Sequence, residues 1–405
     1  MTWLIIPVAV YSVGILALWL ILRGKSDDAL RVAGTLPKVT VVVAARNEEK
    51  NISALLESLL HQDYPPDLLD IIIVNDNSTD RTPIEVSEFI EMHGKQSEIR
   101  MRLIFNPFSG KKRAIRYGIE KAAGELILTT DADCLVGPGW VSAHAGVYGS
   151  LKESTHAGAY GSLKESAHAG MLEASGGVTH EGAGREGSAD MVLGEVCQRP
   201  AKGFAALFGS FEFSALQAVT EAAVRAGCPV MCNAANMSFR REVYLRHAGE
   251  MREELSSGDD MFLLHAVRRA GGRVGYAGSG AAAAETAGAV TVAALLRQRA
   301  RWASKTFHYR DVATLTLAAA TAACNAAVAA AAVASAISVA YLPLLATMYG
   351  LRLVPDYLII ARNIKKRGGK VPVVPFILSE LIYPFWFVTV AFLSLFPASR
   401  RFGRR

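Results

Sequence analysis

The pattern of apolar and polar positions between residues 38 and 134 alternates between strand-like and helix-like segments. Short, mainly apolar and β-branched runs, typical of buried strands, occupy residues 39–45, 70–74, 101–105 and 126–130. Segments typical of helices separate them, at residues 52–61, 82–93 and 111–123. Because strands that are apolar throughout are covered on both faces, this alternation predicts an α/β domain with a mainly parallel sheet.

Longer apolar segments lie towards both ends of the sequence. Residues 3–22 form an uncharged run of the ~20 residues that cross a bilayer, and they lack the basic start and cleavage site of a signal peptide. Residues 312–351 are long enough for two spans, or for one span and an interfacial helix. Residues 371–396 fit one long span, or a tight hairpin broken by Pro375 and Pro384. We predict four spans in total, one before the α/β domain and three after it.

Basic residues gather beside these apolar segments, within residues 23–25, 365–370 and 400–405. A net charge of +6 and a pI of about 9.0 suit nucleic acid as well as anionic lipid, but this distribution is typical of membrane flanks. We therefore expect no nucleic-acid partner, and a multi-pass protein of the cell (inner or plasma) membrane with a cytoplasmic α/β domain. The final RRFGRR also favours the cytoplasmic side, which conflicts with a single last span.

Two carboxylates, Asp131 and Asp133, follow the fourth predicted strand. In extended backbone, side chains two residues apart point to the same side, so both carboxylates can face one point. Mg²⁺ and Mn²⁺ prefer oxygen ligands, and Mg²⁺ usually takes one or two carboxylates together with phosphate oxygens and water. The pair therefore predicts a metal bridge to a diphosphate, with a solvated Asp-Ala-Asp turn as the alternative.

Polar residues also follow the other three predicted strands. In open sheets of this kind, ligands bind beyond the carboxyl ends of the strands, so these residues indicate a nucleotide site at one rim of the sheet. They are Arg46, Asn47 and Glu48 after the first strand, Asp76, Asn77, Ser78 and Asp80 after the second, and Lys111 and Lys112 after the third.

Six motifs, in order, resemble the motif set of family-2 glycosyltransferases, most closely the membrane-bound group that includes cellulose, chitin and hyaluronan synthases. They read AARNEE, VNDNSTD, GKKRAI, TTDADC, GDDMFL and QRARW, and together they cover nearly the whole chain. The resemblance implies a GT-A nucleotide-sugar domain, a UDP-sugar donor, Mg²⁺ or Mn²⁺, and inverting transfer of a hexose.

The resemblance also implies roles for individual residues. Asp260, with Asp259 as its partner, is expected to be the catalytic base; the alternative is that Asp259 caps the following helix. Asp133 is the expected metal ligand, Asp131 contacts the metal or the ribose, and Trp302 stacks near the acceptor sugar. The donor-binding residues that the resemblance implies are Ala44, Arg46, Glu48, Asp76, Lys111, Asp131, Gln298 and Arg301. Asn75 departs from the family, in which two adjacent aspartates are frequent, and leaves the base contact to Asp76.

A twelve-residue repeat beginning at His144 interrupts this pattern, with the copies HAGVYGSLKEST, HAGAYGSLKESA and HAGMLEASGGVT and a decayed fourth. We interpret residues 144–190 as a tandem duplication that forms a flexible surface insert; metal binding by the spaced histidines is a weaker alternative. The predicted organisation is an anchor at residues 1–24, a glycosyltransferase domain at 36–310 that contains this insert, and a membrane region at 311–405.

The sequence therefore predicts a metal-dependent transferase that adds a sugar from a UDP-sugar to a growing polysaccharide or other glycan at the cytoplasmic face of a membrane. Two alternatives stay open. One is the transfer of a single sugar to a membrane lipid, and the other is a weakly active nucleotide-sugar-binding membrane protein. An oligomeric state is left open.

Overall fold

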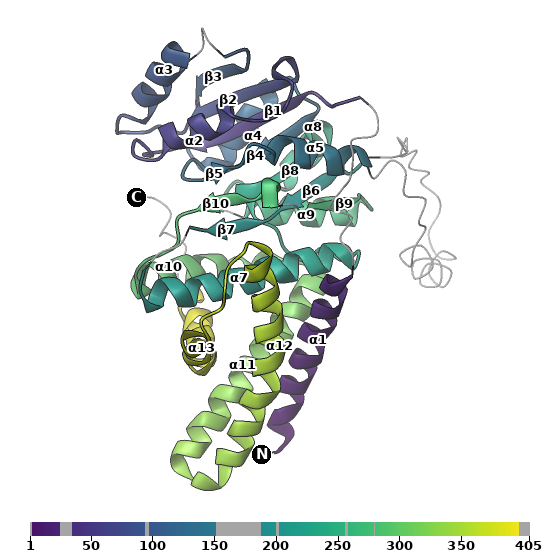
Figure 1. Ribbon diagram of the computed structural model, residues 1–405, viewed down its shortest axis with the longest axis vertical. Coiled ribbons are helices and arrows are strands. Elements are labelled where there is room, and N and C mark those ends of the chain that lie inside the picture. The colour runs from purple at the N-terminus through teal and green to yellow at the C-terminus, as the bar shows by residue number, and fades with distance from the viewer. Residues whose placement is uncertain are drawn as a thin grey trace, which may run out of the picture.

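The computed structural model describes residues 2–24, 35–93, 97–150, 188–199, 202–255, 258–278 and 280–396. An α/β domain lies at one end of the molecule, and a group of long helices extends from its base (Figure 1). The part of the repeat between residues 151 and 187 lies outside the described residues.

A seven-stranded sheet in the order β3-β2-β1-β4-β8-β6-β9 forms the centre of the α/β domain. β1 pairs in parallel with β2 and with β4, and β2 pairs in parallel with β3. β8 is antiparallel to both β4 and β6, and β9 is parallel to β6. This arrangement confirms the predicted mainly parallel sheet. Its strands are β1 (Val39–Ala45), β2 (Leu69–Asn75), β3 (Arg100–Phe105), β4 (Leu126–Thr129), β6 (Met191–Gly194), β8 (Met237–Arg240) and β9 (Val274–Ala277).

Helices cover both faces of this sheet because successive strand residues point to opposite sides. Val41 and Val43 of β1 face one apolar cluster, and Val42, between them, faces the other. The first cluster contains α2 (Ile52–Leu60), α3 (Thr82–His93) and α5 (Trp140–Ser150), and the second contains α4 (Lys111–Lys121), α8 (Arg241–His247) and α9 (Asp259–Arg269). A smaller sheet joins β5 (Leu135–Val136), β10 (Ala284–Thr286) and β7 (Val196–Gln198).

The beginning of the repeat belongs to this core, which corrects the predicted insert at its start. Residues 144–150 form the second half of α5, and His144 is fully buried. Its ring nitrogens contact Ser238 Oγ and Asn236 Oδ1, at 2.9 and 2.8 Å. His144 is therefore a packed core residue, because the helix that carries it lies against the sheet.

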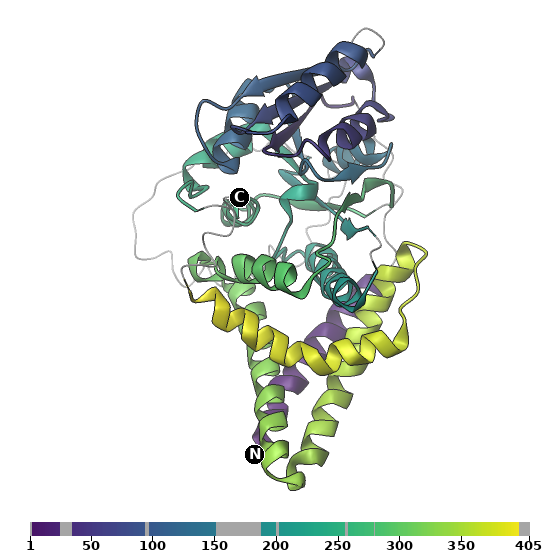
Figure 2. The same cartoon turned by 90° about the vertical axis from the view of Figure 1, so that its left-hand side faces the viewer.

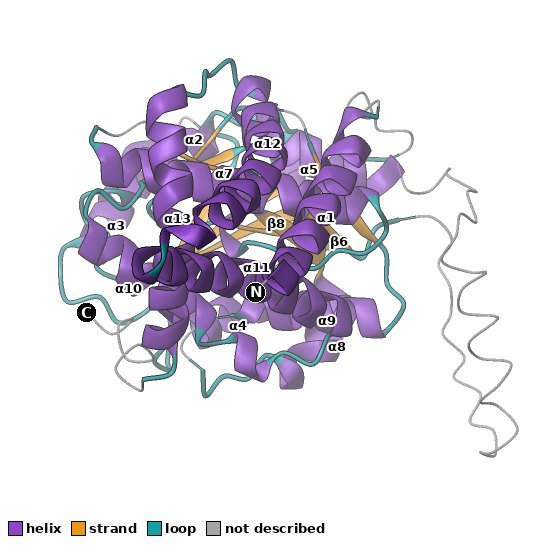
Figure 3. Ribbon diagram, turned by 90° about the horizontal axis from the view of Figure 1, so that it is seen from below, coloured by secondary structure: helices purple, strands orange, loops and turns teal. Residues whose placement is uncertain are grey.

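Two helices, α7 (Phe204–Arg225) and α10 (Val292–Ala303), lie beneath the sheet. From there α1 (Ile5–Arg23), α11 (Val312–Ile337) and α12 (Leu342–Lys366) run side by side away from the domain (Figures 1 and 2). The last helix, α13 (Val373–Ser394), runs across them (Figure 2). Seen from below, the helices lie in front of the strands (Figure 3).

Four of the described helices, α1, α11, α12 and α13, are long and apolar enough to cross a membrane. Residues 312–351 contain one helix and the start of a second, and residues 371–396 contain a single helix rather than a hairpin, with Pro384 inside it.

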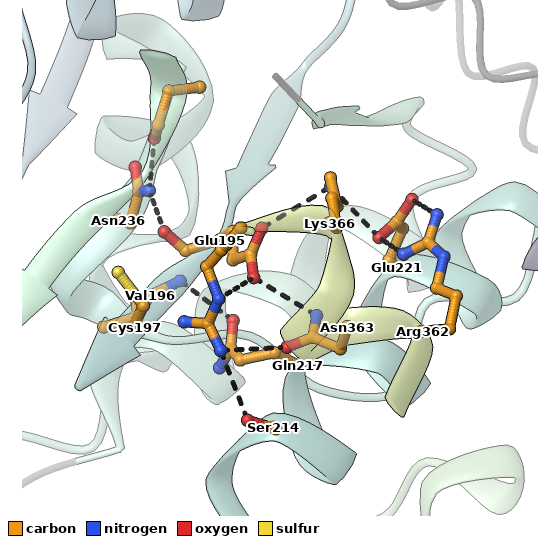
Figure 4. A network of polar contacts seen from close by, with 12 residues as sticks. Glu195, Val196, Cys197, Ser214, Gln217, Glu221, Asn236, Arg362, Asn363 and Lys366 are labelled. Atoms are coloured by element: carbon orange, nitrogen blue, oxygen red, sulfur yellow. Dashed lines mark hydrogen bonds and ion pairs between the residues drawn. The ribbon is translucent and has the colours of Figure 1, made fainter. Parts of the chain in front are cut away.

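A buried polar network joins α12 to the α/β domain (Figure 4). Arg362 donates to both carboxylate oxygens of Glu221, and Lys366 lies 3.4 Å from carboxylate oxygens of both Glu195 and Glu221. Asn363 donates to Glu195 at 3.1 Å. Because both carboxylates are fully buried and paired with cations, this network fixes α12 against the base of the domain.

Candidate active site

The loops that follow β1 and β2 are held together by hydrogen bonds. Asn47 and Asn77 adopt left-handed backbone conformations, with φ of 57° and 58°, which asparagine tolerates better than most residues. The Asn47 side chain accepts from the backbone N–H of Thr79 at 2.8 Å, and the backbone N–H of Glu48 donates to Thr82 Oγ1 at 2.7 Å. These bonds position the exposed Arg46 and the half-buried Glu48 at the rim of the sheet.

Asp76 is buried at the end of β2, next to Ala45 at the end of β1. Its Oδ1 accepts from Asn106 Nδ2 at 2.8 Å and from the backbone N–H of Gly110 at 2.9 Å. Asn75, which departs from the family pattern, accepts from the backbone N–H of Ser78 at 3.2 Å. Asn75 therefore stabilises the turn, and Asp76 is fixed in orientation before any ligand binds.

The two carboxylates after β4 differ in their surroundings. Asp131 forms an ion pair with Lys111 at the start of α4. Burial lowers the pKa of Lys111, but Asp131 and the more distant Asp259 and Asp260 outweigh this effect and raise the pKa above its usual range. Burial, and then the negative charge of Asp131, raise the pKa of Asp133. Lys111 therefore neutralises Asp131 and leaves Asp133 as the less compensated carboxylate.

Within the described parts of the chain, no cluster of three or more His, Cys, Asp or Glu side chains could hold a metal ion by itself. Two carboxylates at the end of one strand are the donor set that Mg²⁺ or Mn²⁺ uses when phosphate and water supply the other ligands. Burial, and then the negative charges of Asp133 and Asp131, raise the pKa of Glu48, so three carboxylates lie within electrostatic range of one another at the rim. This donor set fits a cation held jointly with a bound diphosphate.

Asp259 and Asp260 begin α9, and Gly258 precedes them with a φ of 93°. Gly258 rather than Asp259 is the N-cap residue of this helix, so the interpretation of Asp259 as its cap is wrong. Asp260 accepts from the backbone N–H of Ala234 at 3.1 Å and of Met261 at 2.8 Å. Burial, and then the adjacent Asp259, raise the pKa of Asp260 to about 6. Asp260 is thus oriented by two donors and more basic than an exposed aspartate.

The QRARW motif lies on α10, as the sequence predicts, with Gln298, Arg301 and Trp302 at helical spacing. Trp302 packs against an apolar cluster that includes Cys134, the residue after Asp133. Burial lowers the pKa of Arg301, while Asp131 and Asp260 act in the opposite direction. The helix therefore brings Arg301 within electrostatic range of Asp131, which follows β4, and of Asp260, at the start of α9.

Arg299, which sequence reasoning did not single out, holds this helix in place. It donates to Glu212 at 2.7 Å and to Gln298 Oε1 at 2.9 Å, and its guanidinium lies 4.3 Å from the centre of the Trp302 ring. Its signal in the sequence is its position inside the motif, three residues before Trp302. The side-chain oxygen of Gln298 therefore accepts a hydrogen bond from Arg299, and the Trp302 ring forms a cation–π contact with the same guanidinium.

Lys305, one turn after Arg301, is a second missed residue. It is buried, and its Nζ donates to the carbonyl of Arg301 at 3.1 Å. Burial, and then the charge of Arg301, lower its pKa to about 8, whereas Asp260 acts in the opposite direction. The side chain also covers Gly258, where an added Cβ would lie 3.1 Å from Lys305 Cδ. Spacing of i+4 from Arg301 is the signal that could have revealed it.

Lys112, one of the polar residues expected at the nucleotide rim, serves the fold instead. Lys112 donates to the carbonyls of Met251 and Arg252, at 2.8 and 3.0 Å, so it fixes the loop before α9 rather than binding a nucleotide. Asn236, just before β8, is also structural, because it is fully buried and donates to the carbonyls of Glu195 and Ala282.

Two family models match the chain in succession. The model described as glycosyl transferase family 2 matches residues 40–162, and the model described as glycosyl transferase family 21 matches residues 186–394, about half of the chain. The chain belongs to glycosyl transferase family 21. Its residues 40–162 match family 2, which confirms the resemblance seen in the sequence.

Curated relatives match a shorter part of this glycosyltransferase. The probable glycosyltransferase YdaM of Bacillus subtilis (strain 168) is 42% identical over 100 residues, which are 24% of this chain and 23% of the relative. The beta-monoglucosyldiacylglycerol synthase of Nostoc sp. (strain PCC 7120 / SAG 25.82 / UTEX 2576) is 32% identical over 123 residues, 30% of this chain and 26% of the relative. The matched stretch spans about a quarter of each relative.

A solved structure, the mannosyltransferase PcManGT from Pyrobaculum calidifontis in complex with GDP-Man and Mn²⁺, resembles nearly the whole chain. The TM-score is 0.56 at 20% identity, covering 95% of this chain and 99% of the other. At this identity the likeness concerns the fold, and it confirms the predicted GT-A architecture.

Proposed function

We propose that this glycosyltransferase transfers a hexose from a UDP-sugar, with inversion, to an acceptor at the cytoplasmic face of a membrane. The observation that supports it best is the position of Asp260. It is partly buried, oriented by two backbone N–H groups, and shares its electrostatic surroundings with Lys111 and Arg301. A base beside two cations suits the removal of an acceptor proton while a diphosphate leaves.

In the proposed reaction, Asp260 accepts the proton of an acceptor hydroxyl as its oxygen attacks the anomeric carbon. The bond from that carbon to the UDP oxygen breaks on the opposite face, which inverts the configuration. Lys111 and Arg301 stabilise the charge that develops on the leaving diphosphate. Asp133, with Asp131, would hold Mg²⁺ or Mn²⁺, which supplies further charge neutralisation on the diphosphate when bound.

The donor side is assigned to the rim formed by the first strands. Asp76 is proposed to accept from the uracil ring, with Ala44, Arg46 and Glu48 beside the uridine. Gln298 and Arg301 approach the diphosphate from α10, and Trp302 faces the acceptor sugar. These roles follow the family motifs, and the shared rim of β1, β2 and β4 supports them.

Two acceptor classes are proposed, a growing glycan chain and a membrane lipid. A groove of about 390 Å³ favours the lipid. It lies between α11 and α13 and is lined by Ala326, Ala330, Val333, Phe385 and neighbouring small or apolar side chains. An apolar groove between helices of membrane-spanning composition suits an acyl chain better than a sugar polymer.

The experiment that tests the proposal measures product from the purified full-length chain in lipid, with Mn²⁺ or Mg²⁺ and a panel of labelled UDP-sugars. A single sugar on an extractable lipid supports the lipid acceptor, and a ladder supports a growing glycan. Either product should disappear in Asp260→Asn and after chelation of the metal. UDP binding without product from any donor would contradict the enzyme and favour a binding protein.

A further inference from the structure

Helix α13 remains against the α/β domain along most of its length. Near its start, the Phe376 ring lies 6.0 Å from the Phe211 ring of α7. Further along, the Trp386 ring lies 5.1 Å from the Phe208 ring of α7, and Val390 packs in the same cluster with Leu295 of α10. Residues 376 and 390 are about 21 Å apart along a helix axis. A helix that left the domain to cross a bilayer would keep such contacts at one end alone.

The orientation of α13 agrees with these contacts. Figure 1 shows the helix nearly end-on, and Figure 2 shows it running across α1, α11 and α12. Those three helices share one direction, away from the domain. If that direction is the membrane normal, α13 lies close to the membrane plane.

The face of α13 that points away from the domain is apolar. Val374, Leu381 and Val388 recur every seven residues and are all exposed. The one charged residue of this helix, Glu380, is instead buried against Arg352 of α12, 3.1 Å away. Apolar side chains exposed on one face suit hydrocarbon, whereas the opposite face is occupied by protein.

The Arg352 contact attaches the middle of α13 to the other helices. Arg352 is almost fully buried, contacts Asp356 and Glu380, and donates to Asn325 of α11 at 3.1 Å. Charges at such depth are costly unless they are paired, so the cluster resists separation of α13 from α12.

The charged residues on either side of α13 distinguish a helix that spans the membrane from one that lies in the membrane plane. Basic residues precede it at 365–370 and follow it in RRFGRR at 400–405. Basic flanks favour the cytoplasmic side. A spanning helix would place these two groups on opposite sides of the membrane, and an in-plane helix places both on one side.

We propose that α13 lies in the plane of the membrane, with Val374, Leu381 and Val388 in the acyl chains of the cytoplasmic leaflet, and that it does not cross the bilayer. Three helices, α1, α11 and α12, then span the membrane. The basic segments on both sides of α13 share the side of the α/β domain, which removes the conflict between the final charges and a fourth span. Because α13 packs on α10, the lipid surface lies directly beneath the helix that carries Trp302.

Cysteine labelling of the full-length chain in sealed vesicles tests the topology. Lys370→Cys and Val339→Cys, both exposed, report the domain side and the turn between α11 and α12. Arg404→Cys decides the question, and the unsubstituted chain gives the background of the native cysteines. A membrane-impermeant maleimide should label Arg404→Cys from the same side as Lys370→Cys. Labelling of Arg404→Cys from the side of Val339→Cys would overturn the proposal.

Depth measurements give a second test that does not depend on residues after α13. Spin labels at positions 374, 381 and 388 should show nearly equal accessibility to oxygen and to a polar relaxant. Ile6, Val13 and Leu20 on α1 are the matched control, because they have the same spacing and are also exposed. Labels on α1 should show a depth profile across the bilayer. The same profile on α13 would show that it spans the membrane.

Discussion

Two carboxylates of this glycosyltransferase, the partly buried Asp260 and the fully buried Glu221, have opposite electrostatic surroundings. Glu221 contacts three cations: Arg362, Arg225 at 2.7 Å and Lys366 at 3.4 Å. Burial alone raises its pKa, but these cations outweigh burial and lower the pKa below its usual value. Asp260 has backbone N–H donors and an acidic neighbour, so its pKa is raised. A carboxylate whose negative charge is neutralised by neighbouring cations supports the structure, whereas a carboxylate beside another acid is available as a base.

The largest expected effect is on the chemical step. Asp260→Asn keeps the size of the side chain but cannot accept the acceptor proton. We expect kcat to fall by about 10²–10⁴-fold, because that is the usual contribution of a general base. Steady-state kinetics and UDP binding check this result, with binding expected to persist. Full activity in Asp260→Asn would assign the base to another residue.

Removal of a cation from the site should have the next largest effect. Arg301→Ala removes a planar donor beside Asp131 and Asp260, and we expect kcat to fall by about 100-fold, as for the loss of one donor to a developing anion. Arg301→Lys, the matched control, keeps the charge without the planar fork and should recover part of the rate. Equal rates for both variants would show that the positive charge by itself contributes nothing, whereas full recovery in Arg301→Lys would show that charge alone is sufficient.

The structural carboxylate should respond in stability rather than in chemistry. Glu221→Gln leaves Arg362 and Arg225 without their anionic partner inside the protein. We expect it to lower the free energy of unfolding by about 3 kcal/mol, as when one partner of a buried pair is removed. Thermal unfolding in detergent measures the loss, and kcat of the folded fraction should be retained. A loss of kcat without a loss of stability would contradict the distinction drawn between the two carboxylates.

The pH dependence of activity should follow Asp260. Its carboxylate is the active form and its pKa is raised to about 6, so kcat/KM should decline as the pH falls through about 6 and level off above it. A pH profile at constant ionic strength measures this limb. The limb should be absent from the residual activity of Asp260→Asn, and its persistence there would assign the titration to another group.

The smallest expected effect concerns Lys305, which lies in electrostatic range of Asp260. Lys305→Met removes a nearby positive charge, so the carboxylate becomes harder to ionise. We expect the acid limb of the profile to move to higher pH by about one unit. Lys305→Arg keeps a cation at this position and should leave the limb in place. A purely structural role would lower stability without moving the limb.

Local periodicity explains how much of the site could be predicted. Asp131 and Asp133 follow one strand, and Gln298, Arg301 and Trp302 share one helix face, as expected from spacing alone. Periodicity does not identify distant partners. Lys111 and Lys112 are adjacent, yet one pairs with Asp131 and the other with carbonyls about 140 residues away.

The sequence by itself determined the alternation of buried strands and helices, the membrane-spanning composition of the long helices and the motifs that carry the chemistry. Those properties depend on the order of apolar and polar residues over a few turns or strands. Only the tertiary structure decided that Asp260 is oriented by Ala234, that His144 belongs to the core and that α13 runs across its neighbours. An apolar helix has the same composition whether it crosses a bilayer or lies in it, and contacts with α7, α10 and α12 fix its direction.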